Sequence, residues 1–154
     1  MKTAVFPGSF DPVTKGHVSI IERAIPLFDK IIVAVGQNQD KTGYFPIEKR
    51  LEWLKKSLAA FSSVEIMSYQ GLTVDFCKKN NASYIIRGLR TSADFEFERS
   101  VAQVNLKLDT EIETVFLLTL PEYVMITSSI VREVHKNHGS VAQFVPAEIA
   151  SELP

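Results

Sequence analysis

Short apolar runs alternate with longer amphipathic stretches along the whole chain, and this alternation restricts the fold more than any other feature. The amphipathic stretches carry apolar residues at helical spacing or are bounded by residues that begin and end helices. Strands joined through helices pair in parallel, and an apolar parallel sheet is covered by helices on both faces. The pattern therefore predicts an α/β fold with a five-stranded parallel sheet. The strands are expected at residues 4–6, 30–35, 64–67, 83–86 and 113–118.

Helices are expected between these strands and after the last of them. The stretch 47–60 shows the clearest helical period, because its apolar residues recur every three or four positions. Pro26 lies inside the first expected helix and should kink it or end it early. No repeat, low-complexity tract or linker interrupts the pattern, so residues 1–154 are expected to form one domain. The expected helices span about 18–28, 47–60, 73–79, 93–108 and 128–135.

Composition excludes several classes of function. A net charge of −1 argues against nonspecific binding to nucleic acid or to an anionic membrane, both of which need a basic surface. No apolar run has the length of a membrane span. Cys77 is the only cysteine, which excludes a disulfide framework and a thiolate metal cluster and favours a reducing, cytoplasmic location. Cys77 itself is expected to be a small buried apolar residue.

Polar side chains follow the expected strands, where parallel sheets bind their ligands. Ser9 follows the first strand, Lys41 the second, Thr73 the third, residues 87–90 the fourth and residues 123–132 the fifth. These loops meet at one edge of the sheet, so the side chains are expected to converge. A loop lysine and a basic turn are ordinarily solvated, so none of these segments identifies a function by itself.

The segment 6–17 contains the strongest local signal. An apolar strand ends there in a turn rich in glycine and proline, and a helix is expected to begin around Gly16 and His17. The first amides of a helix lack intrahelical partners and attract anions, and His17 adds a donor at the same place. Ser9 can close over that position from the loop. The segment is typical of a phosphate site, although taken alone it also fits a solvated histidine at a helix start.

Several motifs along the chain resemble one family. Residues 14–17 match the T-x-G-H signature of nucleotidylyltransferases, and residues 7–12 closely resemble the start of the bacterial phosphopantetheine adenylyltransferases. Residues 86–90, followed by 94–98, strongly resemble a second block of that family. Residues 126–132 resemble its I-S-S-S motif, with threonine in place of the first serine. The resemblance covers essentially the whole chain and implies a single Rossmann-like nucleotidylyltransferase domain.

The resemblance also implies a reaction, partners and site residues. The family transfers AMP from ATP to 4′-phosphopantetheine, with Mg²⁺ arriving on ATP rather than on a protein metal site. It further implies a homohexamer and coenzyme A as a feedback ligand. His17 is expected to stabilise the transition state, while Ser9, Lys41, Thr73 and Arg87 bind the acceptor. The implied ATP site consists of Ser9, Phe10, His17, Gly88, Leu89, Arg90, Glu98, Tyr123, Val124, Met125, Ile126, Thr127, Ser128 and Ser129.

Two alternatives stay open at this point. A sister nucleotidylyltransferase could use CTP or another acceptor, although it should lack the blocks around Arg87 and Glu98 in this form. A non-catalytic nucleotide-binding module could share the fold. The sequence has no G-x-x-x-x-G-K-[ST], no G-x-G-x-x-G after the first strand and no nucleophile elbow. These absences argue against P-loop NTPases, dinucleotide oxidoreductases and serine hydrolases.

Overall fold

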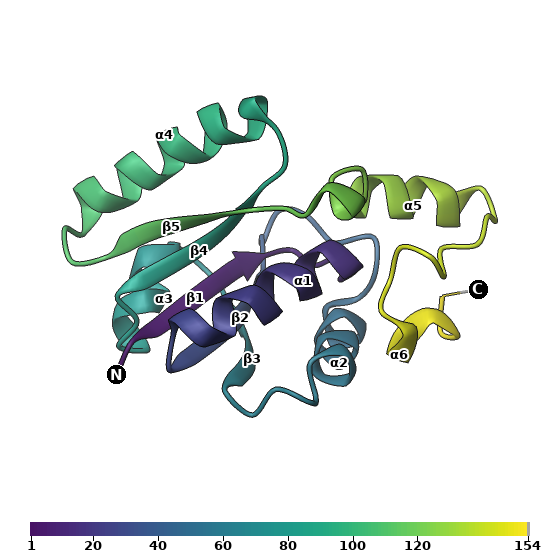
Figure 1. Cartoon of the computed structure of the whole chain (residues 1–154), viewed down its shortest axis with the longest axis horizontal. Coiled ribbons are helices and arrows are strands. Elements are labelled where there is room, and N and C mark those ends of the chain that lie inside the picture. The colour runs from purple at the N-terminus through teal and green to yellow at the C-terminus, as the bar shows by residue number, and fades with distance from the viewer. Residues whose placement is uncertain (154) are drawn as a thin grey trace.

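A parallel sheet of five strands runs through the centre of the computed structural model, which describes residues 1–153 (Figure 1). The strand order is β3-β2-β1-β4-β5, and every neighbouring pair is parallel. The predicted α/β sheet is therefore confirmed. The strands are β1 (Thr3–Gly8), β2 (Lys30–Gly36), β3 (Val64–Tyr69), β4 (Tyr84–Leu89) and β5 (Glu113–Leu118).

Four of the five strands extend beyond their predicted ends, and the extension of β4 moves functional residues. The prediction that Arg87 and the two residues after it follow the fourth strand was wrong, because β4 continues to Leu89. Ladder pairing with β5 continues through these residues and overrides the polar character of Arg87 and the low strand propensity of Gly88. β1 likewise continues to Gly8. Only Arg90 of the basic segment lies beyond the strand.

The helices lie close to their predicted positions, with differences at their ends. The first helix begins at Lys15 rather than near residue 18 and ends at Ala24, where Pro26 changes the chain to a 3₁₀ turn as predicted. Two elements of three and four residues were not predicted, because periodicity cannot be recognised over so few positions. The helices are α1 (Lys15–Ala24), α2 (Ile47–Ser57), α3 (Thr73–Lys79), α4 (Ser92–Leu108), α5 (Ser128–Lys136) and α6 (Ala147–Ala150), with 3₁₀ turns at Ile25–Leu27 and Pro121–Tyr123.

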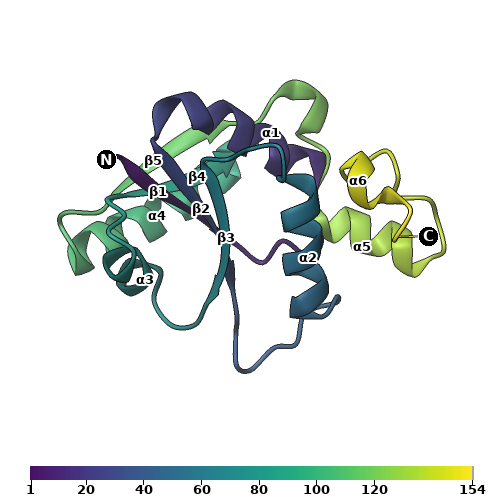
Figure 2. The same ribbon diagram turned by 90° about the horizontal axis from the view of Figure 1, so that it is seen from below.

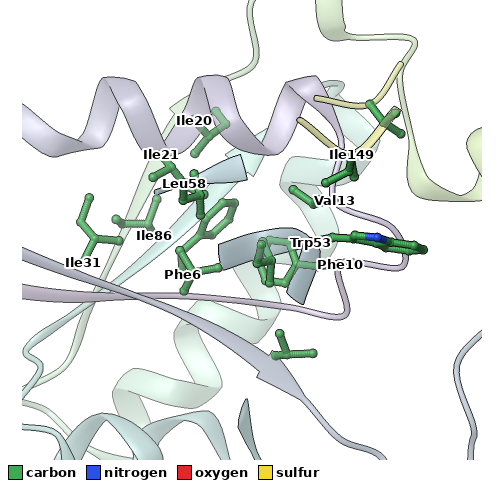
Figure 3. Close-up of a cluster of buried hydrophobic side chains, with 14 of the residues drawn as sticks. Phe6, Phe10, Val13, Ile20, Ile21, Ile31, Trp53, Leu58, Ile86 and Ile149 are labelled. Carbon is green, nitrogen blue, oxygen red and sulfur yellow. The ribbon is translucent and has the colours of Figure 1, made fainter. Parts of the chain in front are cut away.

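The larger hydrophobic cluster lies on the sheet face covered by α1 and α2. Ile20 and Ile21 point from α1 toward Phe6 of the sheet (Figure 3). Trp53 of α2 is 3% exposed and packs in the same cluster, so its side chain belongs to the core. Residues of α5 and α6 also join this cluster, beyond the carboxyl ends of the strands (Figure 2).

The opposite face of the sheet is covered by α3 and α4. Val74 and Cys77 of α3 pack on Ile32 and Ile85. Burial raises the pKa of the Cys77 thiol to about 12, so this cysteine is an inert core residue, as predicted. α4 contains no buried residue, although it lies over β4 and β5 and pairs Phe95 with Phe116.

The sheet opens between β1 and β4, at the point where the strand order reverses. These strands pair only through Ala4 and Val5 with Tyr84 and Ile85, whereas β1 and β2 remain paired to the end of β1. Pro7 has no N–H to donate to a neighbouring strand. The carboxyl halves of β1 and β4 therefore separate, and this gap positions the candidate site.

Candidate active site

The turn after β1 supports one wall of the gap. Phe10 adopts a positive φ of 45°, which is uncommon for a residue with a side chain. Its ring packs edge-on against Phe6 and His17, with centroid separations of 5.5 and 5.0 Å. A Cβ on Gly8 would lie 3.0 Å from the Phe10 ring, so a side chain there would press against the ring and shift it. Packing thus fixes the turn directly beside His17.

A capping box at the start of α1 fixes the His17 ring. The His17 backbone N–H donates to the Thr14 hydroxyl, and the Thr14 backbone N–H donates to His17 Nδ1 over 3.0 Å. Because Nδ1 accepts this bond, the neutral imidazole carries its proton on Nε2. The pKa of His17 falls from 6.5 to about 4, chiefly through burial and also through the cationic Arg87 and Arg90. At neutral pH His17 is therefore an uncharged donor.

His17 faces a pocket of about 370 Å³, called here the His17 pocket. The pocket lies between α1, the end of β4 and the start of α5, and most of its lining groups are hydrogen-bond donors or cations. These are the groups that bind phosphate oxygens. The lining residues are Phe6, Pro7, Gly8, Ser9, Phe10, Thr14, Gly16, His17, Ile20, Arg87, Gly88, Arg90, Asp94, Glu98, Thr119, Tyr123, Ile126, Thr127, Ser128, Ser129 and Arg132.

The start of α5 lines the His17 pocket, and its side chains are tied to the turn after β1. Thr127 caps the helix by accepting the N–H of Ile130 with its hydroxyl oxygen. The Ser128 hydroxyl donates to the carbonyl of Pro12 over 2.9 Å. Two structural elements distant in sequence therefore hold each other in place around the pocket.

A bidentate ion pair joins β4 to α4 beside the gap between the strands. Arg87 Nε and Nη2 donate to the two carboxylate oxygens of Glu98 over 2.8 and 2.6 Å. Arg87 Nη1 also donates to the carbonyl of Pro7 over 2.7 Å. The guanidinium therefore bridges the point where β1 and β4 separate. The Glu98 side chain is 11% exposed, so this pair is stronger than a solvated surface pair.

A second pocket, called here the α4 pocket, has a volume of about 340 Å³. It shares Ser9, Arg87 and Glu98 with the His17 pocket but extends under α4, where most lining side chains are apolar or uncharged. The two pockets meet at the Arg87–Glu98 pair. The lining residues are Pro7, Gly8, Ser9, Gly36, Tyr69, Thr73, Ile85, Arg87, Phe97, Glu98, Val101, Ala102, Asn105 and Thr114.

Most of the predicted site residues lie in these two pockets. Thr73 lines only the α4 pocket. Four predicted residues line neither: Leu89 is buried, Val124 is half-buried, Met125 is 81% exposed, and Lys41 lies in the exposed loop of residues 37–46. The roles given to all of these residues stay predictions.

Arg132 was missed by the sequence reasoning. It lines the His17 pocket and donates to the Asp11 carbonyl over 2.8 Å and to the Ser129 hydroxyl over 3.1 Å. Its position, three residues after Ser129 on a predicted helix, places both side chains on one helix face. The spacing between Ser129 and Arg132 could therefore have identified Arg132 as a candidate site residue. Asp94 also lines the pocket, where its carboxylate accepts the backbone N–H and the Nε–H of Arg90.

No grouping of three or more His, Cys, Asp or Glu side chains suited to a metal ion occurs within residues 1–153. Over the same residues, no helix combines the length and the apolar character that crossing a membrane requires.

The chain is similar to known proteins over almost its full length. Residues 5–134 match the family described as Cytidylyltransferase-like. A phosphopantetheine adenylyltransferase of Clostridium perfringens is 47% identical over 153 residues, which cover 99% of this chain and 93% of that protein. A phosphopantetheine adenylyltransferase of Flavobacterium psychrophilum is 50% identical over 149 residues, covering 97% and 98% of the two chains.

Solved structures share the fold at low sequence identity. A putative nicotinate-nucleotide adenylyltransferase from Vibrio parahaemolyticus superposes with a TM-score of 0.72 at 20% identity and covers 99% of both chains. A bifunctional NMN adenylyltransferase/ADP ribose pyrophosphatase from Francisella tularensis gives a TM-score of 0.73 at 18% identity, over 96% of this chain and 45% of that one. At such identities these likenesses establish the fold alone.

Proposed function

The chain belongs to the cytidylyltransferase-like family and, within it, to the phosphopantetheine adenylyltransferases, and on this premise we propose how its residues carry out the reaction. The enzyme transfers the adenylyl group of ATP to 4′-phosphopantetheine and forms dephospho-coenzyme A and pyrophosphate. One domain, residues 1–154, supplies both pockets in this proposal.

The observation that carries the mechanism is the neutral His17 with its proton on Nε2. A phosphate monoester has a second pKa near about 6, so the acceptor is already a dianion at neutral pH and needs no general base. One of its oxygens attacks the α-phosphorus of ATP, a new P–O bond forms, and the bond to the bridging oxygen breaks as pyrophosphate leaves. His17 donates a hydrogen bond to the α-phosphate as charge develops there.

Groups on either side of His17 hold the two reacting anions. Ser9, Lys41 and Arg87 orient the acceptor phosphate in this proposal, and Arg90 with Ser128 and Ser129 holds the departing pyrophosphate. Arg132 joins the second set, because it lines the same pocket and contacts Ser129. Catalysis is then positioning together with electrostatic stabilisation.

Each pocket is proposed to bind a different substrate. The donors and cations of the His17 pocket suit the triphosphate, whereas the α4 pocket suits the long, mostly uncharged pantetheine arm. Glu98 lines both pockets, and its carboxylate fixes the guanidinium of Arg87. In this proposal Glu98 lines the ATP site directly and positions Arg87 for the acceptor.

Mg²⁺ accompanies ATP in this proposal and screens the charge of the triphosphate. Asp94 and Glu98 are the carboxylates that line the His17 pocket, and each is paired with an arginine. This arrangement fits an ion held by phosphate oxygens rather than by protein carboxylates. Because ATP is the donor substrate, the cytoplasm is the proposed location.

Copies of the chain are proposed to assemble through α4, as a homohexamer. This long helix has no buried residue and exposes Phe97, Val104 and Leu108 at 69%, 59% and 51%. Apolar surface of this kind is typical of contacts between subunits. Light scattering of the purified protein measures the assembly directly. Coenzyme A is proposed to bind as a feedback ligand in the two pockets, since it carries the same pantetheine arm.

A pyrophosphate-release assay tests the proposed function. ATP with 4′-phosphopantetheine should release pyrophosphate in step with the formation of dephospho-coenzyme A. CTP in place of ATP should give little release. Preference for CTP, or for another phosphorylated acceptor, would identify a sister nucleotidylyltransferase. Binding of ATP without release under any pairing would indicate a non-catalytic module.

A further inference from the structure

Asp11 is a buried carboxylate outside the lining of both pockets. It is 6% exposed, and its two oxygens accept the backbone N–H groups of Tyr44 over 2.7 Å and Phe45 over 2.9 Å. Aspartate is seldom buried without such partners, because leaving water costs a charged group much free energy. Asp11 lies in the turn after β1, directly after Ser9 and Phe10. It therefore ties the loop of residues 37–46 to that turn.

Arg50 holds the same two segments from the other side. It is also 6% exposed, although it lies on α2, and its Nη1 donates to the Ser9 carbonyl over 2.8 Å. Its Nε donates to the Phe45 carbonyl over 3.0 Å. Two of its three guanidinium nitrogens thus donate to backbone carbonyls of the turn and the loop. The buried Arg50 side chain therefore connects the turn and the loop through polar contacts rather than through hydrophobic packing of α2.

Gly43 of the loop lies against both Arg50 and Asp11. A Cβ at Gly43 would lie 2.8 Å from Arg50 Nη2 and 3.0 Å from Asp11 Oδ2, so a side chain there would displace the guanidinium or the carboxylate. Glycine allows the loop backbone to approach both charged groups. The three residues, called here the brace, join the turn, α2 and the loop at one place.

The brace restrains the loop close to Lys41, which precedes Gly43 by two residues. Lys41 itself is exposed, and the segment from residue 38 to residue 43 is exposed throughout. Two residues of extended chain span at most ~7 Å, so the brace confines the Lys41 backbone to that distance from Gly43. The turn on which the brace is built is the one that carries Ser9.

We propose that Asp11 and Arg50 are positioning residues that hold the Lys41 loop against the Ser9 turn, so that Lys41 and Ser9 meet the acceptor phosphate together. Neither residue touches the substrate. The inference rests on the proposed role of Lys41 in binding that phosphate. Losing the brace should weaken acceptor binding and leave ATP binding largely intact.

Kinetics of four variants test the brace: Asp11→Asn, Gly43→Ala, Lys41→Ala and the double variant Asp11→Asn/Lys41→Ala. Asp11→Asn should raise KM for 4′-phosphopantetheine by ~10-fold, with KM for ATP changed less than ~3-fold, because one N–H of the loop loses its acceptor. Gly43→Ala should act in the same direction. Asp40→Asn is the matched control, being the same change at an exposed position in the same loop.

Combining Asp11→Asn with Lys41→Ala distinguishes a positioning effect on Lys41 from a general loss of structure. In the Lys41→Ala background, Asp11→Asn should raise acceptor KM by less than ~3-fold, because the lysine that it positions is gone. Amide hydrogen exchange at Tyr44 and Phe45 should accelerate in Asp11→Asn, and this readout does not depend on activity. Additive effects of Asp11→Asn and Lys41→Ala, or equal losses for ATP and acceptor, would overturn the brace while leaving the role of Lys41 standing. An unchanged acceptor KM in Lys41→Ala alone would overturn that role, and the brace with it.

Discussion

The His17 pocket and the α4 pocket open from the same gap between β1 and β4, yet their walls are built differently. In the His17 pocket three of the polar side chains are fixed by bonds to backbone groups: His17 by the N–H of Thr14, Ser128 by the carbonyl of Pro12, and Arg132 by the carbonyl of Asp11. The α4 pocket is walled on one side by a helix without buried residues. Its Phe97 side chain is 69% exposed.

This difference suits the His17 pocket to stabilising the transition state and the α4 pocket to binding the acceptor. Donors that are already oriented stabilise developing charge without reorganisation, which is what a transition state requires. An exposed apolar helix face contributes affinity for an uncharged chain and no charge stabilisation. We therefore expect the loss of His17 to alter turnover, the loss of Arg90 in the same pocket to alter ATP binding, and changes at the border with the α4 pocket to alter acceptor binding. The predictions below test this division, from the largest expected effect to the smallest.

Removing the phosphate from the acceptor should have the largest effect. Pantetheine can still occupy the α4 pocket, but it ends in a neutral hydroxyl whose pKa lies far above 7. We have proposed no base to deprotonate it, so adenylyl transfer should fall by at least ~10⁴-fold, below detection. The measurement is pyrophosphate release with both acceptors at equal concentration. Transfer at comparable rates would reveal a base and would break the division.

Replacing His17 with alanine should lower kcat by ~10²–10³-fold and change KM for ATP by less than ~3-fold, because its contact strengthens in the transition state. Steady-state kinetics provides the measurement. His138→Asn serves as control, since His138 lies at an exposed position and asparagine tolerates its positive φ of 61°. Equal losses in turnover and in ATP affinity would make His17 a ground-state contact.

Glutamine in place of Arg87 or Arg90 should affect different substrates. Arg87→Gln should raise KM for 4′-phosphopantetheine by ~10-fold, and Arg90→Gln should do the same for ATP, because each removes a charge-assisted phosphate contact. The identical chemical change makes each variant the control for the other. Titration of each ligand in each variant measures the split, and identical patterns would show that the two pockets are not separate in function.

The smallest expected effect is on stability as a function of pH. His17 has a pKa of about 4 in the folded protein, against 6.5 as its ordinary value, so the unfolded chain binds the proton more readily between these values. The effect of His17 on the free energy of unfolding is therefore constant above pH 6.5. Below that pH the unfolded chain takes up the proton first, so the free energy of unfolding falls as the pH drops toward 4. Between pH 6 and pH 4.5, the free energy of unfolding should drop more steeply for the native protein than for His17→Ala, by up to ~1.4 kcal/mol per pH unit.

Urea denaturation at several pH values measures this difference in slope. Parallel curves for the native protein and His17→Ala would show that His17 titrates normally. Arg90→Gln should shift the NMR titration of His17 to higher pH, because Arg90 is one of the two cations that depress its pKa.

The periodicity of the chain was sufficient to predict the class of fold and the edge of the sheet at which the candidate pockets lie. Alternating strand and helix patterns depend on local spacing, so the parallel sheet and the position of His17 at a helix start followed from the sequence. The same reasoning ended β4 too early, because ladder pairing with β5 rather than local propensity determines its end at Leu89.

Contacts between residues far apart in the chain were decided only in the tertiary structure. The separation of β1 from β4, the bond from Arg87 to Pro7 and the brace of Asp11 with Arg50 all join segments that sequence spacing does not relate. The neutral state of His17 belongs with them, since burial and neighbouring arginines lower its pKa. The sequence by itself determined which residue types lie at the edge of the sheet. Their charge states and hydrogen-bond partners depend on long-range packing, and only the tertiary structure decided them.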